Sequence, residues 1–157
     1  MKNLIYLLLV MSLIACSKEE NTEQFIIDTD IDISLKDDDG NDLLDPNNTD
    51  SYDENTIKII YEVNGEQFEF YDEKLDAPKG FFIYQHENEY RLRLFPNISD
   101  IENYPVTYIK WNESDTDTIK CLIERKFNSE ICRKVWFNDK VVWESYDTDR
   151  YFEIIKN

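Results

Sequence analysis

Apolar and polar side chains alternate along most of the chain after residue 55, which is the pattern of strands with one buried face. Residues 57–63 alternate in this way, and residues 68–70 resume the alternation after the dipeptide Asn64-Gly65. Asn-Gly readily adopts the positive backbone φ angles that a two-residue hairpin turn requires. The sequence therefore predicts a β-hairpin over residues 57–70.

Further strands are predicted wherever the alternation returns between turn-forming residues. These segments are residues 31–35, 81–85, 89–95, 106–111, 116–125, 131–137, 140–144 and 151–155. No stretch of ten or more residues carries a convincing helical period. About eight or nine strands joined by short turns rich in Asn and Asp predict an all-β fold, a single antiparallel β-sandwich or barrel domain over residues 26–157.

The N-terminus has a different pattern. Lys2 is followed by a run over residues 4–15 that is apolar except for Ser12, and then by Cys16 and a polar stretch. A short apolar run after a basic residue is typical of a secretory signal peptide. The run has about 12 residues and a bilayer-spanning helix needs roughly 20. The pattern therefore predicts a signal peptide over residues 1–15 and not a transmembrane helix.

The end of this run, Leu13-Ile14-Ala15-Cys16, resembles the lipobox of bacterial lipoproteins. By that resemblance, cleavage makes Cys16 the first residue of the mature protein, and its sulfur carries a diacylglycerol group. Two or three acyl chains anchor a protein stably, whereas a single chain binds a membrane only marginally. The expected partner is therefore a membrane. The alternative is an ordinary signal peptide, with Cys16 entering a disulfide.

The residues that follow Cys16 indicate to which membrane the protein is transported. Ser17 in place of an aspartate is compatible with transport to an outer membrane. The stretch Ser17-Lys18-Glu19-Glu20 also resembles the export signal of surface lipoproteins in Bacteroidetes. The resemblance implies a lipid anchor in the outer membrane and exposure at the cell surface. Alternatively, these residues simply begin a flexible acidic tether over residues 16–25.

The charge of the chain is strongly negative, with 17 basic and 34 acidic residues and a formal net charge of −17. Affinity for nucleic acid comes largely from Lys and Arg that neutralise phosphates, so this balance excludes DNA and RNA as partners. The excess is local, because residues 19–54 contain 14 acidic residues and one basic residue, a net charge of 1 − 14 = −13. The remaining body of the domain is only mildly acidic.

The most suggestive polar cluster lies in this acidic stretch. Candidate calcium ligands are Asp37, Asp39, Asn41, Asp42 and Asp45, because Ca²⁺ prefers oxygen ligands and Gly40 permits a tight loop between them. The spacing does not match an EF-hand, which requires carboxylates where this chain has Leu35 and Pro46. The alternative is a solvated turn between two strands.

Three further aspartates precede this loop. Asp28, Asp30 and Asp32 alternate with other residues, so they are expected on one face of a strand. Like charges on one strand face repel. These carboxylates either add ligands to a cation site or face water.

The chain offers little for nucleophilic catalysis. Its single histidine, His86, lies in a polar turn, which argues against Ser-His-Asp and Cys-His mechanisms. Cys121 and Cys132 remain as a pair once Cys16 is lipidated, and an exported protein meets oxidising conditions. They are predicted to form a disulfide, which requires an asymmetric loop or a bulge between their strands. The alternative is two buried thiols that pack as small apolar groups.

Aromatic residues make up 14% of the chain and allow two interpretations. Some of them could form an exposed platform that stacks on sugar rings, while most are needed for the core of a domain of this size. The candidates are Phe68, Phe70, Phe81, Tyr84, Tyr90, Trp111, Trp136 and Trp143.

Several phrases, among them Asp39-Gly40-Asn41-Asp42-Leu43-Leu44 and Lys134-Val135-Trp136-Phe137-Asn138, together with the lipobox, resemble small exported lipoproteins of Bacteroidetes. The resemblance implies an exported β domain and assigns neither an activity nor catalytic residues. The leading hypothesis is a lipid-anchored, non-enzymatic binding or interaction module, with Ca²⁺ as its one candidate cofactor. A glycan-binding module that uses exposed aromatics is the second hypothesis, and a hydrolase with paired carboxylates is the third.

The lipid anchor gives the first testable prediction. Replacing Cys16 with Ala removes the thiol that accepts diacylglycerol, so we expect unprocessed or soluble protein in place of processed, membrane-bound protein. Membrane fractionation and detergent partitioning of cells that express the two forms measure the difference. Unchanged membrane attachment of the Cys16→Ala variant would refute the anchor.

Overall fold

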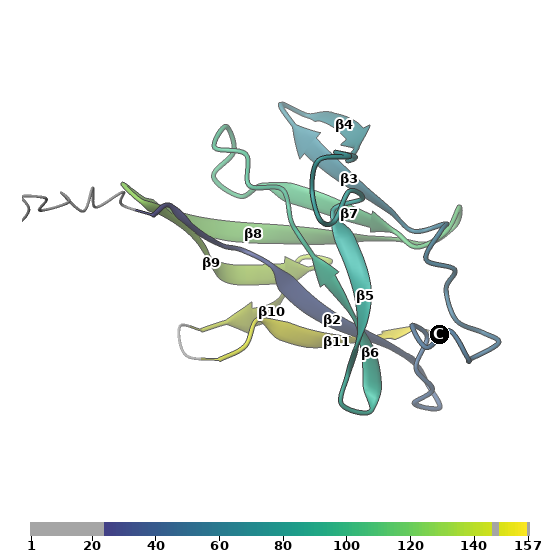
Figure 1. Ribbon diagram of the computed structural model, residues 1–157. Helices are drawn as coiled ribbons and strands as arrows, with labels where there is room; N and C mark the ends of the chain where they lie inside the picture. Colours follow the sequence, from purple (N-terminus) through teal and green to yellow (C-terminus); the bar gives the residue numbers. More distant parts are fainter. Residues whose placement is uncertain (1–23, 146–147, 157) are drawn as a thin grey trace, which may run out of the picture.

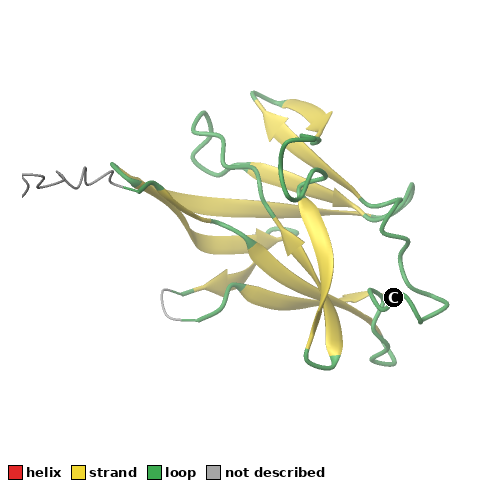
Figure 2. Cartoon of the chain, viewed as in Figure 1, coloured by secondary structure: helices red, strands yellow, loops and turns green. Residues whose placement is uncertain are grey.

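The computed structural model describes residues 24–145 and 148–156. Within these ranges the chain contains eleven strands and no helix, and the strands form two sheets that pack together as an open sandwich (Figures 1 and 2). The predicted all-β sandwich is therefore confirmed, and its sheets do not close into a barrel. In this part of the chain we find no helix that is long and apolar enough to cross a membrane.

The larger sheet has seven strands in the order β1-β9-β8-β7-β3-β4, and β10 also pairs with β9. The strands are β1 (Ile26–Asp28), β3 (Lys58–Val63), β4 (Glu66–Glu69), β7 (Val106–Lys110), β8 (Thr116–Lys126), β9 (Ser129–Phe137) and β10 (Lys140–Glu144). One edge of β9 is shared: its first residues pair with β1 and its last residues pair with β10.

The smaller sheet has four strands in the order β11-β2-β6-β5. They are β2 (Ile31–Asp37), β5 (Phe81–His86), β6 (Glu89–Leu94) and β11 (Tyr151–Lys156). Two links carry the chain from the larger to the smaller sheet near the candidate site, the short link between β1 and β2 and the longer link between β10 and β11.

Turn chemistry explains why the hairpins form where the sequence places them. Asn64 and Gly65 have φ angles of 55° and 77°, and Asn138 and Asp139 have φ angles of 45° and 64°. Positive φ at both central residues defines a turn whose twist matches the flanking strands. The predicted hairpins β3–β4 and β9–β10 are confirmed.

The core is built from the alternating apolar residues of both sheets. Ile31, Ile33 and Leu35 of β2 are fully buried, and they belong to one cluster with Ile109 and Ile119 of the larger sheet. Their polar neighbours in sequence point the other way, because side chains of a strand alternate between its two faces. Burial of such side chains contributes roughly 1.5–3 kcal/mol each, so this cluster dominates the stability of the fold.

Two features depart from the sequence prediction. Strand β1 was not predicted, and two pairings are parallel, β1 with β9 and β11 with β2. The sheets are therefore mixed and not purely antiparallel. The alternation within a strand determines which face is buried but does not determine the direction of a partner far away in the chain.

A buried ion pair joins the two sheets at the end of β11. The carboxylate of Asp117, on β8, is only 5% exposed. It accepts hydrogen bonds from Lys156 Nζ at 2.6 Å, Trp111 Nε1 at 2.8 Å and Asn138 Nδ2 at 2.7 Å. Lys156 also donates to Asp115 at 2.7 Å. The last residue of β11 is thereby fixed to the opposite sheet.

This ion pair gives a prediction about stability. Replacing Asp117 with Ala leaves the indole N–H of the buried Trp111 without its acceptor and removes one of the two carboxylates that bind Lys156. Breaking a buried pair typically costs about 3–5 kcal/mol. We expect a loss of about 3 kcal/mol in the free energy of unfolding, measured by urea denaturation. The matched control is Asp100→Ala, because Asp100 is exposed, and it should change stability by less than about 0.5 kcal/mol. Equal effects of the two substitutions would contradict the prediction.

Candidate functional site

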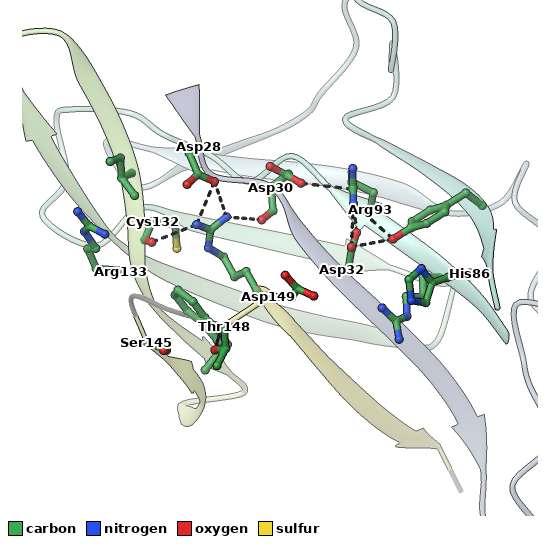
Figure 3. A pocket seen from close by; sticks show the side chains of 15 residues that line it. Asp28, Asp30, Asp32, His86, Arg93, Cys132, Arg133, Ser145, Thr148 and Asp149 are labelled. Carbon is green, nitrogen blue, oxygen red and sulfur yellow. Dashed lines mark hydrogen bonds and ion pairs between the residues drawn. The ribbon is translucent and has the colours of Figure 1, made fainter. Parts of the chain in front are cut away.

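A charged cavity of about 440 Å³ lies where the two links between the sheets meet (Figure 3). Residues of both sheets line it, from β1, β2, β5, β6, β9 and β10, together with residues of both links. The lining contains four aspartates and four arginines, namely Asp28, Asp30, Asp32, Asp149, Arg91, Arg93, Arg133 and Arg150. Such a concentration of paired charge in one concave site makes it the candidate functional site.

Arg150 is the most deeply buried of the four arginines, with a side chain only 10% exposed. Both of its terminal nitrogens lie 3.2 Å from Asp28 Oδ1. They also donate to the backbone oxygens of Asp30 at 2.6 Å and Cys132 at 3.3 Å. Its guanidinium lies over the ring of Trp143, 5.0 Å from the ring centroid. Arg150 therefore fixes the β1–β2 link against β9 and β10.

A second cluster forms on the smaller sheet. Asp32 of β2 and Arg93 of β6 lie directly opposite each other in the antiparallel pairing. Arg93 donates from Nε to Oδ1 and from Nη2 to Oδ2 of Asp32, both at 2.8 Å. The hydroxyl of Tyr84 donates to the same carboxylate at 2.7 Å, and Arg93 also contacts Asp30 at 3.3 Å. A two-pronged pair of this kind fixes orientation as well as charge.

The electrostatics of Asp32 follow from this geometry. Burial raises the pKa of its carboxyl group, but the hydrogen bonds from Arg93 and Tyr84 and the charges of Arg93 and Arg91 outweigh burial. The pKa of Asp32 therefore lies below its ordinary value of 3.8. Burial and the bond to Asp32 raise the pKa of the Tyr84 hydroxyl, which stays protonated. At neutral pH the cluster holds a carboxylate between two fixed donors.

Arg91 lines another wall of the cavity. Its guanidinium stacks on the ring of Tyr151, 3.9 Å from the centroid, and its Nε donates to Glu89 at 2.7 Å. Stacking and this bond fix the plane of the guanidinium. Its terminal nitrogens donate to no other described residue, so they are available to a ligand that enters the cavity.

The three aspartates that alternate before the acidic loop thus have a role that neither interpretation of the sequence included. Asp28 binds Arg150, while Asp30 and Asp32 bind Arg93. They face cations of this same chain. The alternation of Arg91 and Arg93 along β6 could have indicated, from the sequence alone, cationic partners for these aspartates. No sequence pattern indicates that Arg150 and Asp149 belong to the site.

The predicted calcium ligands lie in a different loop, and their carboxylates accept local N–H groups. Asp37 accepts three hydrogen bonds, two from Asn41 and one from the Asp39 backbone, which lower the pKa of the Asp37 carboxyl. Asp42 accepts from the backbone N–H groups of Leu44 and Tyr90, and Asp45 accepts from Asn47. Among the described residues, no three Asp, Glu, His or Cys side chains converge as a metal site would require. Calcium binding at this loop stays a prediction.

Cys121 and Cys132 are both buried and are not bridged in the structure. The pairing of β8 with β9 shifts by one residue between Leu122 and Ile123, so that Ile123 lies opposite Cys132. This irregularity is the bulge that a link between the two cysteines requires. A hydrogen bond with Cys132, together with burial, raises the pKa of the Cys121 thiol. The two thiols are thus neighbours, and the disulfide stays a prediction.

The proposed aromatic platform is mostly core. Trp111, Phe81 and Trp143 are buried, and of the eight aromatics considered only Phe68 is classed as exposed. A second cavity of about 430 Å³ is lined mainly by apolar side chains that include Tyr61 and Phe70, and also by Ile27 and Thr29, which alternate with Asp28 and Asp30 of the charged cavity. The candidate lipidation residue Cys16 and residues 1–15 lie outside the described residues.

Comparison with known proteins gave no match: no protein-family model, no curated protein and no solved structure is similar enough to this chain to count as one.

The Asp32 cluster gives a prediction about pH. A carboxyl group whose pKa is lowered by folding stabilises the native state above its ordinary pKa, and the effect is lost as the pH falls through the folded-state pKa. We therefore expect Asp32→Asn to cost about 2 kcal/mol at pH 7, the scale of hydrogen bonds to charged groups. The cost should shrink once the pH falls below about 3.8. Urea unfolding of both proteins between pH 7 and pH 3 measures it, and a difference that stays constant over this range would contradict the assignment.

Proposed function

We propose that the protein is a lipid-anchored, outer-membrane or cell-surface protein that acts as a non-enzymatic binding module, and that the charged cavity is its ligand site. The observation that carries this proposal is the balanced lining of the cavity, four guanidinium groups and four carboxylates within one hollow of about 440 Å³. The volume is that of a small-molecule site.

Preorganisation supports binding in this cavity. Arg93 and Arg150 are each held by more than one acceptor, and Arg91 is held by stacking and by Glu89. Groups that are already fixed lose little conformational freedom when a ligand arrives. The lining can therefore present donors and acceptors at fixed positions without rearranging.

The balance of charge favours a ligand rich in hydroxyl groups over a strongly charged one. A hydroxyl donates to one group and accepts from another, which suits a wall that alternates carboxylates with guanidinium groups. The terminal nitrogens of Arg91 can donate, and the carboxylate of Asp149, which makes no side-chain hydrogen bond to the described residues, can accept. We therefore infer a glycan segment or another polyhydroxylated molecule as the ligand class.

The state of the carboxylates supports binding over hydrolysis. A glycoside hydrolase needs one carboxylic acid whose pKa is raised so that it can donate a proton. The pKa of Asp32 is instead lowered, and Asp28 and Asp30 each face a guanidinium group. Asp32 therefore accepts hydrogen bonds from fixed donors as an ionised carboxylate and is unsuited to donate a proton.

Ligand binding gives the fourth prediction. The detergent-solubilised full chain is screened by thermal shift against neutral oligosaccharides, acidic oligosaccharides and amino acids. We expect a neutral oligosaccharide to raise its melting temperature most. Asp149→Ala should then weaken binding of that sugar by about 10-fold to 100-fold in calorimetry, the scale of one hydrogen bond to a charged group.

Asp100→Ala is the matched control for this measurement, because Asp100 is an exposed aspartate that does not line the cavity. It should leave the affinity unchanged. Equal affinities of wild type and Asp149→Ala would exclude the cavity as the ligand site, and a shift with charged probes only would contradict the ligand class.

A further inference from the structure

Four large apolar side chains are exposed at one end of the sandwich, on both faces of β1 and in the neighbouring turn. They are Phe25, Ile26 and Ile27 at the start of the described chain, and Phe127 in the turn between β8 and β9. The backbone N–H of Ile26 donates to the carbonyl of Asn128 at 2.9 Å, and β1 runs parallel to β9 from that point. Figure 1 shows the first described residues, which lead into β1, beside the β8–β9 turn. We call this set of four residues the apolar tip.

Phe127 is unusual for its position. The described chain has four hairpins with two-residue turns, and three of them use Asn64-Gly65, Glu87-Asn88 and Asn138-Asp139. Only the turn between β8 and β9 contains a large apolar residue, and Phe127 is 91% exposed there. Exposed apolar side chains that cluster mark a contact surface. The described residues leave this side chain almost fully exposed.

The position of the tip along the chain indicates what covers it. Phe25 follows Cys16 by nine residues, and nine residues of fully extended chain span at most about 32 Å. If Cys16 carries acyl chains, the tip is the part of the described domain that the tether holds nearest to the bilayer. Lys126 beside Phe127 has a long, exposed side chain whose ammonium lies 2.7 Å from Glu124, and a stem of this length can reach the headgroup region.

We propose that the apolar tip inserts into the interfacial region of the lipid bilayer and orients the domain on the membrane. This proposal rests on the lipid anchor of the proposed function, because the tether supplies the proximity. Asp28 follows Ile27 directly and lines the charged cavity. The domain would therefore present its ligand site close to the membrane surface and not at the far end of the sandwich.

The test is a fluorescence measurement on the lipidated full chain in vesicles of phosphatidylethanolamine and phosphatidylglycerol. In Phe127→Trp, the added tryptophan should emit at shorter wavelength than in detergent-free buffer and should be quenched by lipids with brominated acyl chains. The wild type provides the baseline, because Trp111 and Trp143 are buried and Trp136 is partly buried in the body of the domain.

Val141→Trp is the matched control. Val141 is half-exposed on β10 and pairs with Trp136, seven residues along β9 from Ser129 and thus about 23 Å from the tip. Its tryptophan should not be quenched by brominated lipids. A Phe127→Trp signal that is no more quenched than that of Val141→Trp would overturn the proposal.

Flotation of the same vesicles separates the two proposals. Protein that floats with the vesicles while Phe127→Trp stays unquenched retains its anchor and refutes the tip. Protein that does not float refutes the anchor, and with it the tip proposal that depends on it.

Discussion

Two largely buried cations at the ends of β11 fix this strand against the larger sheet. Arg150 directly precedes β11 and Lys156 is its last residue, and the buried side chains of Phe152 and Ile154 lie at alternate positions between them. Arg150 binds Asp28 of β1 and Lys156 binds Asp117 of β8, and both of these carboxylates belong to the other sheet. Apolar packing between sheets is not directional. The ion pairs at the two ends of β11 are directional, and they fix where this strand begins and ends against the larger sheet.

The charged cavity follows from the first of these attachments. The chain leaves the larger sheet twice near the same place, after β1 and after β10, and Arg150 binds the first link while belonging to the second. The guanidinium donates to backbone carbonyls of the first link and of β9 as well as to Asp28. The side chains around it are then left facing a hollow and not a packed core. The same cluster of charges therefore serves the fold and the proposed function. Arg150 mainly stabilises the fold, whereas Arg91 and Asp149 retain hydrogen-bonding capacity for a ligand.

How far the sequence predicted this molecule depends on the range of each interaction. The hairpins were predictable because the turn residues Asn64-Gly65 and the flanking alternation are local. The parallel pairing of β11 with β2 was not, since 119 residues separate the partners (151 − 32 = 119) and alternation carries no information on direction. The same limit applies to the site. Arg91 and Arg93 alternate visibly on one strand, but the contact of Arg93 with Asp32 exists only through the pairing of β2 with β6.

The aspartates of the acidic stretch form two groups with different partners in the structure. Residues 19–54 carry a net charge of −13, which as a sequence suggests a single acidic feature. Asp28, Asp30 and Asp32 are neutralised by arginines drawn from β6 and from the β10–β11 link, whereas Asp37, Asp42 and Asp45 are stabilised by N–H groups of nearby backbone and amide side chains. Repulsion among the first three is therefore relieved without an added cation. The second group is stabilised by hydrogen bonds within its own loop and to β6, and no three of its side chains converge as a metal site requires among the described residues, so the charged cavity is the stronger candidate for a ligand site.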